Sequence, residues 1–274
     1  MDEASQALLA MFAGATLLGK KNVWIGDTKQ LPPIVVLSED KVSKKNYTAL
    51  VDGLKAISDK AALPIFQLTE SYRLTDRAAK YSGIFYNGTL KSKSKNDIRL
   101  YFEELSKDVS KLLNSQGGPT FIKTDLPIGD YKPITGISLT TEIVIHLLSL
   151  NENLHISVLS YFVETTKALQ KKIFQTIGYK KNLLIETVSR IQGLTTDICI
   201  FLIPNASYHR SLEGRLFNVA TSRSKRHTII ISDKNVLTRS QVDNEVWQYL
   251  IKLNDEFSFY IPFDQDYKSL PELL

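Results

Sequence analysis

The sequence predicts an α/β protein in which helices cover both faces of a parallel sheet. Strand and helix patterns alternate along residues 119–253, as is typical of parallel strands joined by helical crossovers. Two short apolar runs, residues 198–203 and 228–232, are typical of strands buried on both faces. The 274 residues are 43% hydrophobic, which is enough for one large or two small cores.

The charge and the cysteine content limit the classes of protein to which this chain can belong. The net charge is +5 and the pI is about 9.0; this modest basic excess matches a protein that meets a polyanion, but any soluble protein also carries such an excess. Cys199 is the single cysteine, which excludes a disulfide framework, and its apolar neighbours predict a small core side chain. No apolar run approaches the length of a membrane span, and the first residues are acidic, unlike a signal peptide. We therefore expect a cytoplasmic protein with no membrane partner.

The first part of the chain predicts short helices and strands around one proline-containing loop. A helical pattern covers residues 4–18 and follows two acids, which suit a helix N-terminus. A strand over residues 22–25 leads into Gly26-Asp27-Thr28-Lys29-Gln30-Leu31-Pro32-Pro33, where two prolines exclude regular structure. Further helices are predicted over residues 47–57, 77–86 and 98–114, and a strand over residues 65–68.

The clearest break in the chain is Gln116-Gly117-Gly118-Pro119, a candidate domain boundary. Before this break, the basic loop Lys91–Asn96 is either a solvated connection or a contact with phosphates. After it, strands are predicted over residues 119–123, 155–160, 183–187, 197–203 and 227–232, and helices over residues 140–150, 163–177, 211–223 and 241–253.

The stretch from Arg215 to Ser232 predicts an amphipathic helix that breaks near His227 and enters a buried strand. Its apolar residues recur at three- and four-residue steps, and the predicted helix places Arg223 at its end. Arg223, Lys225 and Arg226 either complement the negative end of the helix macrodipole, or one of them is an arginine finger that stabilises charge on a transferring phosphoryl group. The stretch alone leaves both alternatives open.

Other polar residues suit phosphate chemistry but also have ordinary structural explanations. Asp2 and Glu3 either lie on a surface turn or position Mg²⁺ and water for phosphoanhydride hydrolysis. Gln30 follows a strand, in a loop of the kind that binds ligands at the edge of an α/β sheet, and would bond a γ-phosphate. Arg73 adds a cation, and residues 187–193 place hydroxyls, a cation and a glycine at a strand end. A capped turn would explain each alone, so only their order and spacing favour a common site.

Five stretches follow one another along the chain: Asp2–Gln6, Gly26–Pro33, Tyr72-Arg73 with Ile84–Leu90, Thr187–Asp197, and Arg215–Lys225. In this order they resemble successive motifs of superfamily 1B helicases, in particular the group that contains the nonsense-mediated-decay helicase and its DNA-acting relatives. The resemblance covers residue 1 to about residue 253. It implies a RecA-like parallel sheet with helices on both faces, the second helicase motor domain, plus a remnant of the first RecA-like domain.

The resemblance implies ATP and Mg²⁺ as cofactors and assigns roles around them. Asp2 would bind Mg²⁺ and Glu3 would be the catalytic carboxylate. Gln30 would sense the γ-phosphate from the first domain. Arg73 and Arg223 would reach the phosphates from the side of the second domain.

The resemblance also implies single-stranded DNA or RNA as the partner. Gln192 and Gly193 would couple the nucleotide state to the nucleic acid. The positions near the phosphates of the bound strand would be Ser160, Thr187, Val188 and Ser189.

The chain departs from the family pattern at two points. Thr195 stands where the family often has a glutamate that helps hold the nucleotide. No Gly-rich loop ending in Gly-Lys-Ser/Thr occurs in these 274 residues, so the backbone amides and lysine that cradle the β- and γ-phosphates are missing. We therefore expect that this chain alone neither binds ATP tightly nor hydrolyses it, and that the missing first motor domain acts in cis or in trans.

The expected organisation has three parts: a remnant of the first RecA-like domain at residues 1–75, a helical connection with a basic loop at residues 76–116, and the second RecA-like domain at residues 117–274. Apolar positions on residues 4–18 would then pack against the second domain or be exposed.

Three functions fit the sequence. The first is the C-terminal motor portion of an ATP-dependent helicase or translocase. The second is a non-catalytic nucleic-acid-binding or regulatory module that is derived from a helicase. The third is an unrelated α/β domain with chance matches, which a structure without a parallel sheet over residues 117–235 would favour.

Overall fold

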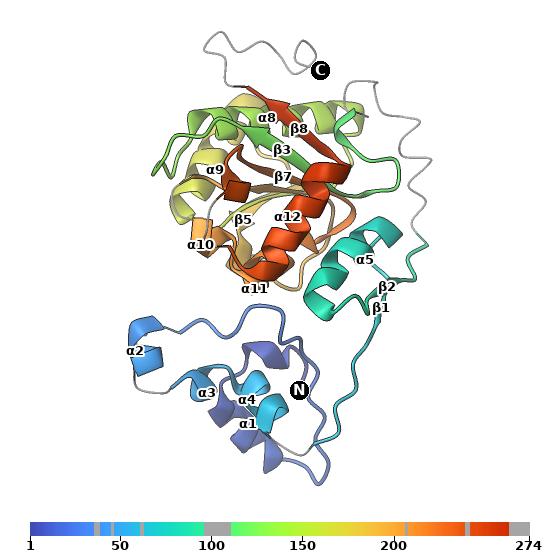
Figure 1. Ribbon diagram of the computed structural model, residues 1–274, viewed down its shortest axis with the longest axis vertical. Helices are drawn as coiled ribbons and strands as arrows, with labels where there is room; N and C mark the ends of the chain where they lie inside the picture. Colours follow the sequence, from blue (N-terminus) through green and yellow to red (C-terminus); the bar gives the residue numbers. More distant parts are fainter. Residues whose placement is uncertain are drawn as a thin grey trace. The chain divides into compact units, whose positions relative to one another are not determined.

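The computed structural model describes residues 1–35, 39–44, 47–60, 63–95, 111–205, 208–238 and 242–262. The chain divides into two compact units, Met1–Leu68 and Thr69–Leu274, and Figure 1 labels the helices and strands of each. The described residues of the predicted connection, residues 76–116, belong to the second unit. Most of the predicted helix over residues 98–114 lies outside the described residues.

The first unit begins with two extended segments that pair side by side. The α-ammonium of Met1 donates to the carbonyl of Val23 at 2.8 Å, and the N–H of Ile25 donates to the carbonyl of Met1 at 2.8 Å. This alternation is the hydrogen-bond pattern of parallel strands. The helical elements of the unit are η1 (Ala4–Gln6), α1 (Leu9–Thr16), α2 (Glu39–Lys44), α3 (Thr48–Val51) and α4 (Gly53–Lys60).

Several predicted elements of the first unit are shorter than expected. The single helix predicted over residues 4–18 is divided into η1 and α1, and the helix over residues 47–57 is divided into α3 and α4. Residues 22–25 and 65–68 form no strand of a sheet, although the former pair with Met1. A pattern of apolar residues does not show where a short helix is interrupted, and the structure places these interruptions at Ala7-Leu8 and Asp52.

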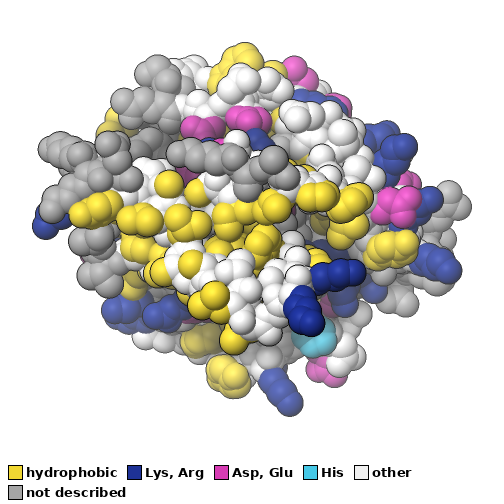
Figure 2. All heavy atoms as spheres, turned by 90° about the horizontal axis from the view of Figure 1, so that it is seen from below, with side chains coloured by type: hydrophobic (Ala, Val, Ile, Leu, Met, Phe, Trp, Pro, Cys, Tyr) yellow, Lys and Arg dark blue, Asp and Glu magenta, His cyan; other side chains and the backbone are white. Residues whose placement is uncertain are grey.

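The core of the first unit is small and its apolar surface is large. Phe12 is buried and packs edge-to-face on Trp24 at 5.6 Å between ring centroids. Leu17 and Leu18 are 87% and 88% exposed, whereas Ala4 and Ala7 of the same stretch are buried with Phe12. Figure 2 shows hydrophobic side chains gathered in a band across one face. The exposed apolar residues of the unit include Met11, Val23, Ile25, Ile34, Leu50, Ile65, Phe66 and Leu68.

The second unit is built on a six-stranded, fully parallel sheet with strand order β5-β4-β6-β7-β3-β8. Its central strands carry isoleucine, leucine and phenylalanine on both faces and are buried, as expected when helices cover both sides. The strands are β3 (Gly118–Thr124), β4 (Ile156–Ser160), β5 (Leu183–Thr187), β6 (Thr196–Leu202), β7 (Ser224–Asp233) and β8 (Ser258–Ile261).

The direction in which each connection moves across the sheet determines which face its helix covers. The connections through α8 (Ile134–Leu150) and α9 (Val163–Ile177) move toward β5, whereas those through α11 (Gly214–Thr221) and α12 (Asn244–Glu256) move toward β8. Because parallel crossovers are right-handed, opposite directions place the two pairs on opposite faces. Contacts agree, since α8 packs on α9 and α11 packs on α12, and Figure 1 shows α12 crossing the sheet. The predicted α/β fold with helices on both faces is thereby confirmed.

Smaller elements precede the sheet. Arg77 in α5 (Asp76–Ser82) donates to the carbonyls of Gly117 and Pro119, which holds α5 against the start of β3. Tyr81 of the same helix packs on Tyr249 of α12 at 5.0 Å between centroids. The remaining elements are the paired strands β1 (Glu70–Ser71) and β2 (Lys91–Ser92), and the short helices η2 (Gly83–Tyr86), η3 (Val188–Arg190), α10 (Tyr208–Ser211) and η4 (Val236–Thr238).

Predicted boundaries hold best in the second unit. The bounds of α9 and β5 match the prediction, whereas α8 starts at Ile134 rather than at residue 140. The break predicted near His227 is wrong: α11 ends at Thr221 and β7 starts at Ser224, so His227 lies inside the strand. There it pairs with Gly118 of β3 and Ile198 of β6, pairings that the local sequence does not reveal. None of the described helices is long and apolar enough to cross a membrane.

Candidate functional site

Arg223 lies just beyond the C-terminal end of α11, before β7 begins. Its Nε donates to the carbonyl of Val219 at 2.9 Å, and its Nη2 to Ser222 Oγ at 3.4 Å. The side chain is 2% exposed. The guanidinium therefore satisfies a carbonyl of the last helical turn, as a helix-end cation does.

Arg73 reaches the same helix end from a distant part of the chain. Its Nη1 donates to the carbonyl of Ser222 at 3.3 Å, across 149 residues of sequence. Arg73 directly follows β1 and Tyr72, and the N–H of Arg73 donates to Ser71 Oγ at 3.3 Å, which fixes the turn that carries it. The structure thus brings two of the arginines predicted for the site together around one residue, Ser222.

The segment from Thr187 to Thr196 crosses the sheet from the carboxyl ends of the strands, here called the carboxyl edge, to their amino ends, the amino edge. It leaves the carboxyl end of β5, forms η3, and reaches the amino end of β6, where the N–H of Thr196 donates to the carbonyl of Arg223 at 3.1 Å. Gly193 has φ +83°, a left-handed conformation that favours glycine. Gln192 Nε2 is buried without a hydrogen-bond partner among the described residues. Gln192 and Gly193 therefore lie between the predicted nucleic-acid edge and the end that carries Arg223.

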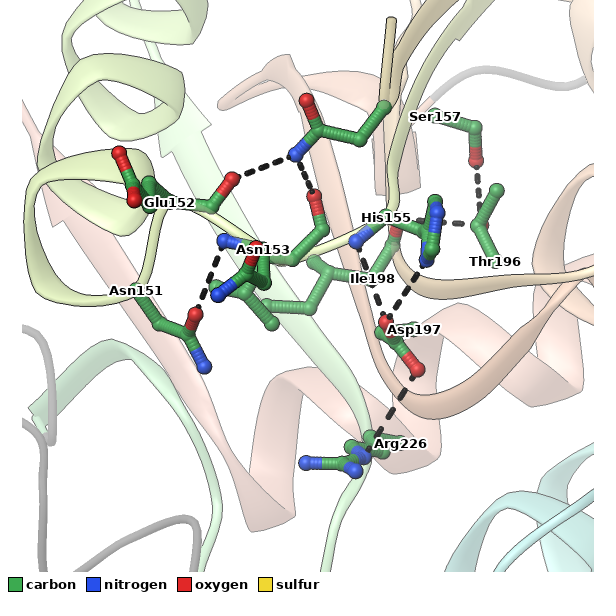
Figure 3. Close-up of polar contacts among 11 residues, drawn as sticks. Asn151, Glu152, Asn153, His155, Ser157, Thr196, Asp197, Ile198 and Arg226 are labelled. Atoms are coloured by element: carbon green, nitrogen blue, oxygen red, sulfur yellow. Dashed lines mark hydrogen bonds and ion pairs between the residues drawn. The ribbon is translucent and has the colours of Figure 1, made fainter.

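A polar network anchors this segment at the amino edge (Figure 3). Asp197 Oδ2 accepts the backbone N–H of His155 at 3.1 Å and lies 3.7 Å from its Nδ1, while Oδ1 lies 3.9 Å from Nε of Arg226. Ser157 and Thr196 share a hydrogen bond at 2.9 Å. The network ties the starts of β4, β6 and β7 together, next to the helix end that Arg73 and Arg223 contact.

The carboxyl edge carries the hydroxyls predicted to face a nucleic-acid strand. Ser160 and Thr187 are partners in register at the ends of β4 and β5. Thr187 Oγ1 lies 3.3 Å from Ser189 Oγ, and Ser160 Oγ is buried without a hydrogen-bond partner among the described residues. Val188, also predicted to lie near the strand, is fully buried.

The remaining predicted residues lie in the first unit. Asp2 Oδ1 accepts the N–H of Glu3 at 2.9 Å, and Glu3 adopts φ +49°, a conformation uncommon outside glycine. Gln30 Nε2 donates to Asp27 Oδ2 at 3.0 Å. The N–H of Ala4 donates to the carbonyl of Ile25 at 2.8 Å, which brings the two acids beside the loop that carries Gln30.

Gly26 allows this close approach within the first unit. A Cβ at this position would lie 2.7 Å from the backbone nitrogen of Ser5 and 2.8 Å from the side chain of Leu54. No other residue fits there without moving the backbone of η1. The glycine that begins the predicted Gly26–Pro33 motif therefore has a packing role as well.

Two polar contacts near α11 are not predicted from the sequence. Asn218, which is 1% exposed, donates through Nδ2 to the hydroxyl of Tyr86 at 2.9 Å and joins α11 to η2. The second link is the contact of Asp197 with Arg226. Both Asn218 and Tyr86 lie inside motif stretches, but a buried hydrogen bond across 132 residues leaves no local pattern.

The buried cysteine behaves as the sequence predicts. Cys199 is fully buried in β6, and its Sγ donates to the carbonyl of Ala220 in α11 at 3.3 Å. Burial raises the pKa of the thiol to about 12. The side chain is therefore a core hydrophobe and an unreactive thiol at neutral pH.

Comparison with known families identifies the chain. A family model described as an AAA domain matches residues 53–235. The chain belongs to this family. The match includes the three later motif stretches, from the one with Arg73 to the one with Arg223. The two earlier stretches, at residues 2–6 and 26–33, lie outside it.

Two curated helicases resemble this AAA-domain chain. An uncharacterized ATP-dependent helicase of Methanocaldococcus jannaschii is 24% identical over 271 residues, which cover 93% of this chain and 39% of that protein. The DNA replication ATP-dependent helicase/nuclease dna2 of Schizosaccharomyces pombe is 26% identical over 286 residues, which cover 92% of this chain and 20% of that protein. The chain thus spans less than half the length of each relative. The predicted resemblance to superfamily 1 helicases is confirmed.

Two solved structures are also similar. The PRRSV helicase is 15% identical, with a TM-score of 0.41, and the match covers 99% of this chain and 47% of that one. The C-terminal domain of a possible DNA helicase from Lactobacillus plantarum is 15% identical, with a TM-score of 0.34, and the match covers 53% of this chain and 93% of that one.

Proposed function

We propose that this chain is the C-terminal motor portion of an ATP-dependent helicase or translocase that acts on single-stranded nucleic acid. The observation that carries the proposal is the meeting of Arg73 and Arg223 at the end of α11. Two fixed planar cations suit a site where charge develops on a phosphoryl group. The segment of residues 187–196 joins this end of the sheet to the hydroxyl-bearing edge, as coupling between nucleotide and strand requires.

The first unit carries the residues that the resemblance assigns to ATP and Mg²⁺. Bound ATP with Mg²⁺ would supply the phosphoanhydride and the metal charge. Asp2 would hold Mg²⁺ through an exposed carboxylate, which fits a metal that takes one or two protein carboxylates and keeps water and phosphate oxygens as its other ligands. Glu3 would accept a proton from water, and Gln30 would donate to the γ-phosphate. Among the described residues, no group of three or more His, Cys, Asp or Glu is arranged as a metal site.

A further part of the first motor domain would complete the phosphate site, in cis or in trans. The 274 residues contain no Gly-Lys-Ser/Thr loop, and the first unit exposes a large apolar surface that a packed domain would cover. We infer that the chain on its own neither binds ATP tightly nor turns it over. The cytoplasmic location expected from the single cysteine remains a prediction.

The test measures ATP hydrolysis and strand binding by the 274-residue chain. Single-stranded DNA or RNA should bind with an affinity that falls steeply as salt rises, since each phosphate contact contributes to the salt slope. ATP turnover should be absent with and without nucleic acid. Nucleic-acid-stimulated turnover that survives Glu3→Gln would contradict the assignment of both the missing cradle and the catalytic carboxylate. Competition between DNA and RNA of one sequence would identify the preferred strand.

A non-catalytic nucleic-acid-binding or regulatory module is the second candidate. The burial of Arg223, and its bond to Val219, favour it, because an arginine held by its own helix serves the fold without reaching a phosphate. The two candidates differ in one readout. When the complementing first motor domain is present, Arg223→Lys should abolish turnover in a motor, whereas a regulatory module shows no turnover in either form.

A further inference from the structure

Three aromatic side chains meet at the carboxyl edge of the sheet. Tyr131 follows β3, and Tyr161 and Phe162 follow β4 directly. Tyr131 and Tyr161 each pack edge-to-face on Phe162, both at 4.8 Å between centroids, with interplanar angles of 83° and 87°. We call these three residues the aromatic platform.

The platform is held firmly by the start of α9. Thr165 is fully buried, and its Oγ1 donates to the carbonyl of Tyr131 at 2.6 Å. The N–H of Thr166 donates to the carbonyl of Phe162 at 3.0 Å. Two loops from different strands are thereby fixed to one helix, so the rings are preorganised rather than ordered only by a ligand.

The platform is partly exposed and has exposed apolar neighbours. Tyr131 is 39% exposed, and Ile128 and Ile134, on the same loop and at the start of α8, are 81% and 76% exposed. Val163, at the start of α9, is also exposed. Exposed apolar side chains gathered beside aromatic rings suit a site that binds a ligand with apolar faces.

The charges beside the platform determine on which side a polyanion can run. On one side, Ser160 immediately precedes Tyr161 and is in register with Thr187, and just beyond lies Arg190, which is exposed and 3.4 Å from Glu186. On the other side, a cavity of about 500 Å³ is lined by Ile128 and Ile134 together with Asp130, Asp233 and Asp125, of which Asp125 is paired with Lys234 at 2.6 Å. Carboxylates repel phosphates, so the phosphates of a strand belong on the side of Ser160 and Thr187.

We propose that the aromatic platform stacks the bases of a single nucleic-acid strand whose phosphates run past the carboxyl ends of β4 and β5, where Ser189 and Arg190 are exposed. The inference rests on the proposed function and adds the residues that contact the bases. Every base presents a π face, so half-exposed rings accept any sequence. The bases point toward the apolar, acidic side, where exocyclic amino groups meet carboxylate and amide oxygens.

The test compares normal and abasic oligonucleotides of equal length and charge. Tyr131→Leu removes the ring and keeps an apolar side chain. It should weaken binding of the normal single strand about 5- to 100-fold, the range for loss of one stacked base. It should leave binding of the abasic strand unchanged, and the salt slope should not change because the phosphate contacts remain.

Matched variants control for folding and for nonspecific effects. Tyr131→Phe keeps the ring and should bind as the unsubstituted chain does. Tyr179→Leu removes a tyrosine that is 78% exposed on the turn before β5, at the opposite edge of the sheet, and should have no effect.

The outcomes separate the two proposals. If the unsubstituted chain binds the strands in a salt-dependent manner but Tyr131→Leu has no effect, or weakens both oligonucleotides equally, the platform is wrong and the proposed function stands. If the unsubstituted chain binds no single strand at low salt, the proposed function fails and the platform fails with it.

Discussion

The guanidinium of Arg223 lies at the end of α11, where its hydrogen bonds match the first of the two roles predicted for it. It bonds the carbonyl of Val219 in the last turn of α11, as a helix-end cation does. Arg73 bonds the adjacent carbonyl of Ser222, so a second cation stands beside it. A side chain with several donors can satisfy the helix end and still belong to a phosphate site.

His227 makes stability depend on pH. It is fully buried in β7, and burial, with added repulsion from Arg226 and Arg77, lowers its pKa to about 3. The unfolded chain, with an ordinary pKa near 6.5, therefore binds a proton that the folded chain rejects. The contribution to stability is complete above about pH 6.5 and is lost at about 1.4 kcal/mol per pH unit as the pH falls toward 3.

Urea unfolding at a series of pH values between 5 and 7 would check this effect. His227→Leu should reduce the fall in unfolding free energy below pH 6.5, whatever its effect at neutral pH. His155→Gln is the control for replacing a histidine as such, because the side chain of His155 is 68% exposed. Equal slopes for the unsubstituted chain and His227→Leu would count against a depressed pKa.

At the scale of elements, α5 depends on a glycine at the start of β3. Gly118 has φ +79°, and a Cβ there would lie 2.9 Å from the backbone nitrogen of Ala78 in α5. Gly129 has a similar φ of +75° but nothing within 4 Å of its Cβ position. A side chain at either glycine would strain the backbone in the same way. Only at Gly118 would the added Cβ also clash with a neighbouring helix, α5.

Gly118→Ala should therefore destabilise the protein more than Gly129→Ala does. We expect about 1–2 kcal/mol for Gly129→Ala, from the left-handed conformation alone, and about 1–3 kcal/mol more for Gly118→Ala, from the displaced helix. Chemical unfolding followed by circular dichroism measures both values. Similar losses would mean that α5 shifts freely, which its bonds through Arg77 argue against.

At the scale of the whole molecule, the two units differ in how much apolar surface they bury. Among the described residues, the buried hydrophobic cluster of the first unit comprises Ala4, Ala7 and Phe12, whereas that of the second extends through the six-stranded sheet and its helices. A small core contributes little stability against the conformational entropy of the chain. The first unit should therefore unfold at lower denaturant than the second.

The two tryptophans report on the two units separately. Trp24 packs on Phe12 in the first unit, and Trp247 lies in α12 of the second. In Trp247→Phe, fluorescence from Trp24 should change at a lower urea concentration than the circular dichroism of the whole chain. In Trp24→Phe, fluorescence from Trp247 should follow the circular dichroism. Coincident transitions in both variants would show that the chain unfolds as one cooperative unit.

Local sequence patterns determined much of the second unit. The alternation of apolar runs with amphipathic segments predicts the parallel sheet, and the bounds of α9 and β5 match their patterns. The order of motifs indicates the helicase family, which the AAA-domain match supports. These features could be read in advance because each depends on residues that are close together in the chain.

Only the tertiary structure decided the features that depend on distant residues. Arg73 reaches Ser222, the residue before Arg223, across 149 residues, and β7 begins at Ser224 because its polar start pairs with β6. The sequence contains twelve tyrosines and twelve phenylalanines and does not distinguish core rings from exposed ones. The structure shows that Tyr131, Tyr161 and Phe162 are in contact after the ends of β3 and β4. The arrangement of strands in the sheet brings these loops together, although they are separate in the sequence.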